Sequence, residues 1–108
     1  MTEIDKNEIE RIKNLLLPVF KRKKTKKVYL FGSLSKGTQT KRSDIDLMII
    51  AETDKRFFER YEDYESIQRI LSDRAVEMLI YTPNELTGIA HRVFIKRILE
   101  EGEVLYEC

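Results

Sequence analysis

The chain has 108 residues, of which 42% are apolar and 36% are charged. This length suits one domain with one core, and the apolar share excludes an intrinsically disordered chain. The formal net charge of +1 excludes a global attraction to nucleic acid or to an anionic membrane surface. We therefore expect a single folded domain over residues 1–108.

Cysteine usage and the absence of apolar segments bear on the compartment. The single cysteine, Cys108, is the last residue and cannot form an internal disulfide, which fits a reducing environment. The first twelve residues contain no apolar core of a signal peptide, and no apolar run approaches the roughly 20 residues of a membrane span. We expect a cytoplasmic protein that does not bind membranes.

The N-terminal part predicts an amphipathic helix, because apolar residues recur at helical spacing from Ile4 to Phe20. Pro18 is expected to end or kink this helix near Leu17. Lys21–Lys27 then holds six cations in seven residues. It is either a phosphate or nucleic-acid patch or a solvated connector. We favour the connector, since the run has no aromatic residue for base stacking, and direct nucleic-acid binding is not expected.

Two apolar runs of strand length, residues 28–31 and 43–51, flank a polar loop. Gly32 allows the backbone to bend sharply and to approach a ligand closely. Ser33 is suited to cap a short helix up to Gly37, whose free N–H groups would bind phosphate. This loop is therefore a candidate phosphate site.

The second of these runs opens with two carboxylates, Asp44 and Asp46. Side chains two residues apart in a strand point to the same face, with Cα atoms about 7 Å apart. Two like charges at this separation are costly unless a cation lies between them. Mg²⁺ is the obvious candidate, because it binds carboxylate and phosphate oxygens.

Residues 55–71 carry a broad apolar and aromatic stripe at helical spacing, which we interpret as core packing against a sheet. A helix between strands favours a parallel neighbour, and residues 75–80 form the next strand-like run. Glu77 is the only carboxylate in that run. If the run lies beside residues 43–51, Glu77 projects from the same face as the aspartates.

The last predicted helix covers residues 83–101. Thr82 and Glu85 have the spacing of a capping box, Pro83 suits the first helical position, and Gly102 is a helix stop. Its apolar residues cover more than one face, which leaves surface for a partner. Residues 104–106 are expected to form a short edge strand.

Gly32-Ser33, followed after ten residues by Asp44-Ile45-Asp46, resembles the Gly-Ser-x10-Asp-x-Asp signature of the polymerase-β-like nucleotidyltransferases. The small size and the single downstream carboxylate, Glu77, are similar to the minimal (MNT) branch of that superfamily. The resemblance implies an α/β (α+β) fold with a mixed sheet of three or four strands. We expect its helices to lie largely on one side of the sheet.

The resemblance also implies roles for individual residues. Asp44 and Asp46 would bind two Mg²⁺ ions about 4 Å apart. Glu77 would take the position of the third carboxylate, which helps to hold metal beside the acceptor hydroxyl and favours its deprotonation. Many relatives have Asp there, and the longer Glu side chain shifts the carboxylate by about one methylene.

The nucleotide-binding residues implied by the resemblance are Gly32 and Ser33, around the β- and γ-phosphates of ATP. Lys36 and Arg42 are near enough in sequence to neutralise phosphate charge, although each could equally be a solvated loop residue.

The activity implied by the resemblance is Mg²⁺-dependent transfer of AMP from ATP to a hydroxyl, expected to be a tyrosine, of a HEPN-type toxin. The chain would then be the antitoxin of a toxin–antitoxin pair, and the modification would silence the toxin. Two alternatives remain open: an antitoxin that acts by binding alone, and adenylyl transfer to a small molecule. The second is less favoured, because the chain has no additional domain to hold such a substrate.

Overall fold

A computed structural model describes residues 3–32 and 44–108. Four strands form one mixed sheet in the order β3-β2-β1-β4. The strands are β1 (Thr25–Phe31), β2 (Ile45–Ala51), β3 (Val76–Tyr81) and β4 (Glu103–Glu107). The pair β2–β3 is parallel, and β1 runs antiparallel to both β2 and β4. The mixed sheet, the parallel neighbour and the C-terminal edge strand are thus confirmed.

Helix α1 (Glu3–Arg22) is longer than predicted, because Pro18 does not end it. Proline removes one hydrogen bond of the helix, here the one to the carbonyl of Asn14. Both residues are exposed, so water can hydrate that carbonyl. The opposite face is buried on either side of the proline, at Leu16 and Phe20, which holds the helix against the sheet.

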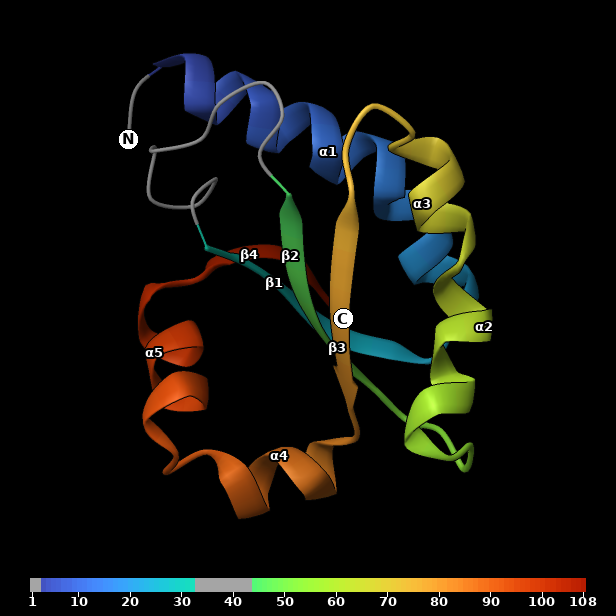
Figure 1. The fold of residues 1–108 in the computed structure, drawn as a ribbon, viewed down its shortest axis with the longest axis vertical. Helices are drawn as coiled ribbons and strands as arrows, with labels where there is room; N and C mark the ends of the chain where they lie inside the picture. Colours follow the sequence, from blue (N-terminus) through green and yellow to red (C-terminus); the bar gives the residue numbers. More distant parts are fainter. Residues whose placement is uncertain (1–2, 33–43) are drawn as a thin grey trace.

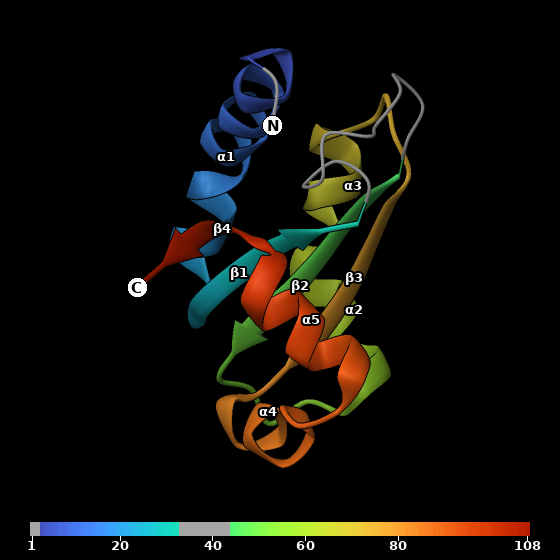
Figure 2. The same cartoon turned by 90° about the vertical axis from the view of Figure 1, so that its left-hand side faces the viewer.

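The helices cover both faces of the sheet, so the expectation that they lie largely on one side was wrong (Figures 1 and 2). Alternate residues of β1 and β2 enter two separate cores. Val28, Leu30 and Leu47 pack with α1 and with the helical turns after β2. Tyr29, Met48 and Ile50 pack with the C-terminal helices. Because the central strands are apolar on both faces, each face requires its own helical cover.

Both predicted long helices are divided into shorter segments. Residues 55–71 form a 3₁₀ turn, η1 (Phe57–Arg60), and two short helices, α2 (Tyr61–Tyr64) and α3 (Ser66–Ile70). The predicted helix 83–101 is two helices, α4 (Pro83–Ile89) and α5 (Val93–Glu101). Between them Arg92 adopts an extended backbone with ψ of 138°. This break allows α4 to contact β2 and β3 while α5 contacts β1.

The start of α4 is fixed by a capping box and by a buried arginine. The Thr82 hydroxyl accepts a hydrogen bond from the Glu85 N–H, and the Glu85 carboxylate accepts one from the Thr82 N–H, as predicted. The guanidinium of Arg60, only 6% exposed, donates to both Glu85 oxygens at 2.6 and 3.0 Å and to the Ile80 carbonyl at 3.0 Å. These bonds join η1, the end of β3 and α4.

Within the described ranges no helix combines the length and the apolar composition needed to cross a membrane.

Candidate active site

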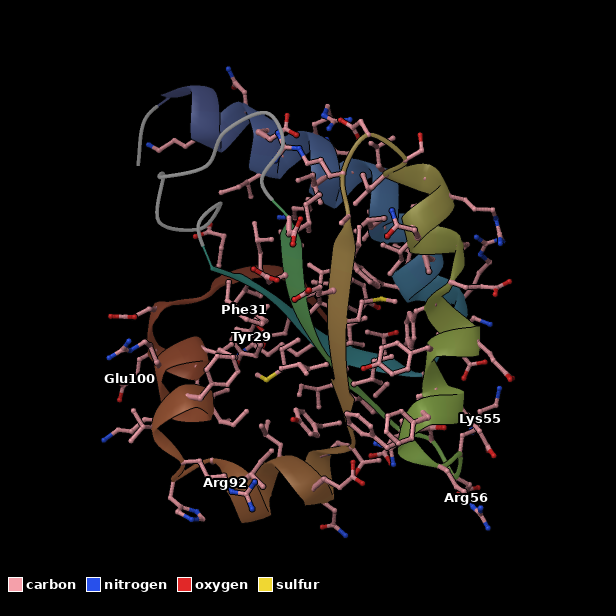
Figure 3. All side chains as sticks on the ribbon, in the orientation of Figure 1. Tyr29, Phe31, Lys55, Arg56, Arg92 and Glu100 are labelled. Atoms are coloured by element: carbon pink, nitrogen blue, oxygen red, sulfur yellow. The ribbon has the colours of Figure 1, made fainter. Side chains whose placement is uncertain are left out.

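Three side chains form a row across the sheet at the end of β1. Phe31 is the Cα partner of Asp46, and Asp46 is the Cα partner of Glu77 on the parallel strand β3. Asp46 alternates in phase with Met48 and Ile50, whose side chains enter the core beside α5. The row therefore faces α5, and Glu77 projects from the same face as Asp46, as the sequence predicted. Figure 3 shows Phe31 on this side of the sheet.

An open hollow of about 450 Å³ lies over this row. Its polar side chains are Asp46 and Glu77, and its other walls come from β1, β3 and α5: Phe31, Gly32, Met78, Leu79 and Phe94. A carboxylate pair in the wall of an otherwise apolar hollow can bind a cation or accept a proton from a ligand hydroxyl.

The carboxylates are crowded. Partial burial is the largest cause that raises the pKa of Asp46; the negative charges of Glu77 and Asp44 and a hydrogen bond to Glu77 add to it. Together they raise the pKa from 3.8 to about 6. Asp44 is exposed just before β2 begins. Asp46 therefore holds a proton more strongly than an isolated carboxyl does, and a bound cation would relieve the same repulsion.

Gly32 brings the backbone directly against Asp46. Its φ of +81° lies in the left-handed region, which agrees with the sharp bend predicted here. A Cβ at this position would collide with a carboxylate oxygen of Asp46. The end of β1 thus needs glycine for two reasons, its backbone conformation and the close approach of the carboxylate.

The other predicted nucleotide-binding residues, Ser33, Lys36 and Arg42, lie outside the described residues. Within residues 3–32 and 44–108, no three His, Cys, Asp or Glu side chains form a complete metal-binding group. The donor chemistry nevertheless fits Mg²⁺, because the oxygens of Asp46 and Glu77 are already adjacent and Asp44 lies close enough to affect the pKa of Asp46. Ligation by all three stays a prediction.

The sequence interpretation missed the contribution of α5 to the site. Phe94 was counted among the apolar residues of a helix, but its side chain is 57% exposed and stands edge-on to Phe31, with ring centroids 5.8 Å apart. No sequence signal distinguishes it from its buried neighbour Ile95, because the exposure depends on where α5 crosses the sheet.

A hollow of about 480 Å³ lies at the far end of the sheet, away from the acidic row. Its lining mixes charges of both signs, and Lys55 and Lys23 approach Asp63 at 2.9 and 3.9 Å. Lys27 is paired with Glu107 at 3.2 Å. Only part of the basic stretch is a connector: Lys23 and Lys24 link α1 to β1, whereas Lys21 and Arg22 end the helix and Lys26 and Lys27 lie in the strand. That the stretch does not bind nucleic acid stays a prediction.

Comparison with known proteins identifies the family. The model of the family "Polymerase beta, Nucleotidyltransferase" matches residues 10–108. A Methanocaldococcus jannaschii protein named "Putative protein adenylyltransferase MJ0604" is 29% identical over 85 residues, 79% of this chain and 82% of the relative.

Two solved structures have a similar fold. A chain of a toxin–antitoxin crystal structure with AMP-PNP is 26% identical, with a TM-score of 0.67 over 89% of this chain and 73% of that one. A chain of the complex between tri-AMPylated Shewanella oneidensis HEPN toxin and MNT antitoxin is 20% identical. Its TM-score is 0.61 over 93% of this chain and 73% of that one. The fold, the acidic row and the family match agree: this chain belongs to the polymerase beta nucleotidyltransferase family and is a nucleotidyltransferase.

Proposed function

We propose that the chain transfers AMP from ATP to a hydroxyl group of a HEPN-type toxin and thereby acts as its antitoxin. The observation that carries this proposal is the pairing of Asp46 with Glu77 on adjacent strands, facing an open hollow with Gly32 at its edge. Nucleotidyl transfer needs closely spaced carboxylates beside a backbone that a phosphate can approach.

Asp44, Asp46 and Glu77 would hold Mg²⁺, most simply as two ions. When bound, the ions supply the positive charge that neutralises the triphosphate and lowers the pKa of the acceptor hydroxyl. The raised pKa of Asp46 supports this assignment, because partial burial and the negative charges of Glu77 and Asp44 all disfavour an unpaired carboxylate at this position.

In the proposed reaction the acceptor oxygen bonds to the α-phosphorus. The bond from that phosphorus to the bridging oxygen of pyrophosphate breaks, and pyrophosphate leaves with the electron pair. The acceptor loses its proton, for which the carboxylate of Glu77 is the nearest base on β3. Gly32 and Ser33 would hold the β- and γ-phosphates, and Lys36 and Arg42 would neutralise part of their charge.

The acceptor is proposed to be a tyrosine. Its ring matches the apolar walls of the hollow, and its hydroxyl would approach the carboxylates of Asp46 and Glu77. A HEPN toxin as partner is supported by the similar chain in the AMPylated toxin complex.

The test combines the full chain with ATP labelled at the α-phosphate, Mg²⁺ and the product of the neighbouring gene, which the proposal predicts to be a small all-helical protein. The proposal predicts label on a tyrosine of the partner and loss of the partner's RNase activity. If the complex forms and the toxin is inhibited without label transfer, the chain is an antitoxin that acts by binding alone. Label on an added small molecule, with none on the partner, would indicate a small-molecule adenylyltransferase.

A further inference from the structure

A second, smaller hollow of about 170 Å³ adjoins the acidic one. Phe31, Gly32 and Phe94 line both hollows, but Asp46 and Glu77 line only the larger one. The smaller hollow is completed by the C-terminal half of α5. An engineered apolar cavity of about 150 Å³ holds benzene, so this hollow has room for a flat ring.

The ring of Phe94 forms one wall of the smaller hollow. It stands at 87° to the ring of Phe31, and this edge-to-face contact restrains its orientation. Its side chain is 57% exposed, whereas Ile95 and Ile98 of the same helix are 4% and 3% exposed. A large aromatic side chain held in place and left open is suited to stack on a planar ligand.

Polar groups stand at the rim of the same hollow. Arg97 and Glu101 line it, with side chains 65% and 59% exposed. Their ion pair is long, with Nε and Oε2 4.0 Å apart, and such an exposed pair contributes little stability. Both groups are therefore available to a ligand, the guanidinium as a donor and the carboxylate as an acceptor. The edge of adenine offers an amino donor beside a ring nitrogen that accepts.

We propose that the smaller hollow is the nucleobase subsite, in which adenine stacks on Phe94 while Arg97 and Glu101 bind its polar edge. This inference rests on the proposed function and adds the residues that select the base. The position of Gly32 supports it, because phosphates at this turn would border both hollows. The acceptor must reach the α-phosphorus beside Asp46 and Glu77 and therefore occupies the larger hollow. The smaller hollow, which Asp46 and Glu77 do not line, remains for the base.

The test measures binding by calorimetry on the full chain with Mg²⁺, so it needs neither partner nor turnover. The probes are AMP-PNP and inorganic tripolyphosphate, which has the phosphates but no base. Phe94→Ala should weaken AMP-PNP binding about tenfold and change tripolyphosphate binding less than about twofold. Phe94→Tyr keeps the ring and should restore binding. Val93→Ala, an exposed neighbour that lines neither hollow, is the matched control.

A second comparison concerns the base edge. Inosine triphosphate carries an oxygen in place of the adenine amino group, so the Glu101 carboxylate should disfavour it. Glu101→Gln, whose amide can donate as well as accept, should narrow the preference for ATP over inosine triphosphate several-fold. An unchanged preference would overturn the role of Glu101.

The remaining outcomes separate this inference from the proposed function. If the wild-type chain binds neither probe, the proposed function fails and the subsite fails with it. If it binds both but Phe94→Ala binds AMP-PNP normally, or loses both probes equally, only the subsite is refuted. Normal AMP-PNP binding with impaired label transfer would instead assign Phe94 to the acceptor and overturn the base subsite.

Discussion

Asp46 and Glu77 are Cα partners on the parallel strands β2 and β3, and their side chains face the same hollow. The register of one strand pair thus creates the carboxylate pair on which the candidate chemistry depends. Partial burial and repulsion in this pair disfavour the charged form of Asp46, which a bound cation would stabilise.

Asp46→Asn should remove Mg²⁺-dependent transfer while keeping the fold. The amide has no negative charge and is a weaker Mg²⁺ ligand than a carboxylate, and we expect activity to fall at least about 100-fold. Thermal stability of the metal-free protein should be equal or higher, because the substitution relieves like-charge crowding. Asp54→Asn, an exposed carboxylate away from the acidic row, is the control. Full activity in both Asp44→Asn and Asp46→Asn would overturn the metal assignment.

The pH dependence of the unfolding free energy should show the titration of Asp46. Its pKa is raised from 3.8 to about 6, so the folded state binds more protons than the unfolded state between these values. The free energy of unfolding should therefore decrease as pH rises through this window and level off above it. Urea unfolding at several pH values, without metal, measures the slope. Asp46→Asn should remove it, and saturating Mg²⁺ should reduce it.

Gly32→Ala should damage both stability and transfer. A non-glycine residue at φ of +81° costs about 1–2 kcal/mol, and the added Cβ would also displace the Asp46 carboxylate. Gly88→Ala in α4 is the matched control, because its Cβ would meet no atom within 4 Å. That variant should gain about 0.5–1 kcal/mol from helix propensity. Equal stability of the two variants would contradict the proposed constraint at Gly32.

Glu85→Gln should destabilise the fold by about 1–3 kcal/mol, since it leaves the buried Arg60 guanidinium without its countercharge. The Arg60 guanidinium lowers the pKa of Glu85 to about 2, helped by a hydrogen bond from the Thr82 N–H. This stabilisation is complete above the unfolded value of 4.5 and is lost as pH falls toward about 2. The difference in unfolding free energy between wild type and Glu85→Gln should therefore shrink as pH falls from 4.5 toward about 2, and acid unfolding measures it.

The control for that prediction is Glu65→Gln. Glu65 pairs with Arg69 at 3.2 Å, but both side chains are about two-thirds exposed, at 66% and 69%. Such a pair contributes less than about 0.5 kcal/mol. A comparable loss in both variants would show that burial of Arg60 is not the cause.

The helix boundaries show which features local sequence patterns can predict. The capping box at Thr82 and Glu85 correctly predicts the start of α4, because all of its hydrogen bonds join residues three apart. The break at Arg92 was not predicted, since no proline or glycine marks it. It arises where α4 contacts β2 and β3 and α5 contacts β1. Pro18 likewise suggested a helix end, but packing on both sides of it kept α1 continuous.

By itself, the sequence determined the strands, their apolar phase and the candidate acids, because the apolar pattern of each strand and the Gly-Ser-x10-Asp-x-Asp spacing are local properties of the chain. Only the tertiary structure decided that Glu77 stands opposite Asp46, and that Phe94 remains open beside Phe31. Strand register and exposure are set by contacts between segments far apart in the chain. The sequence therefore shows which reactive side chains are present, and only the packed fold shows which of them lie next to one another.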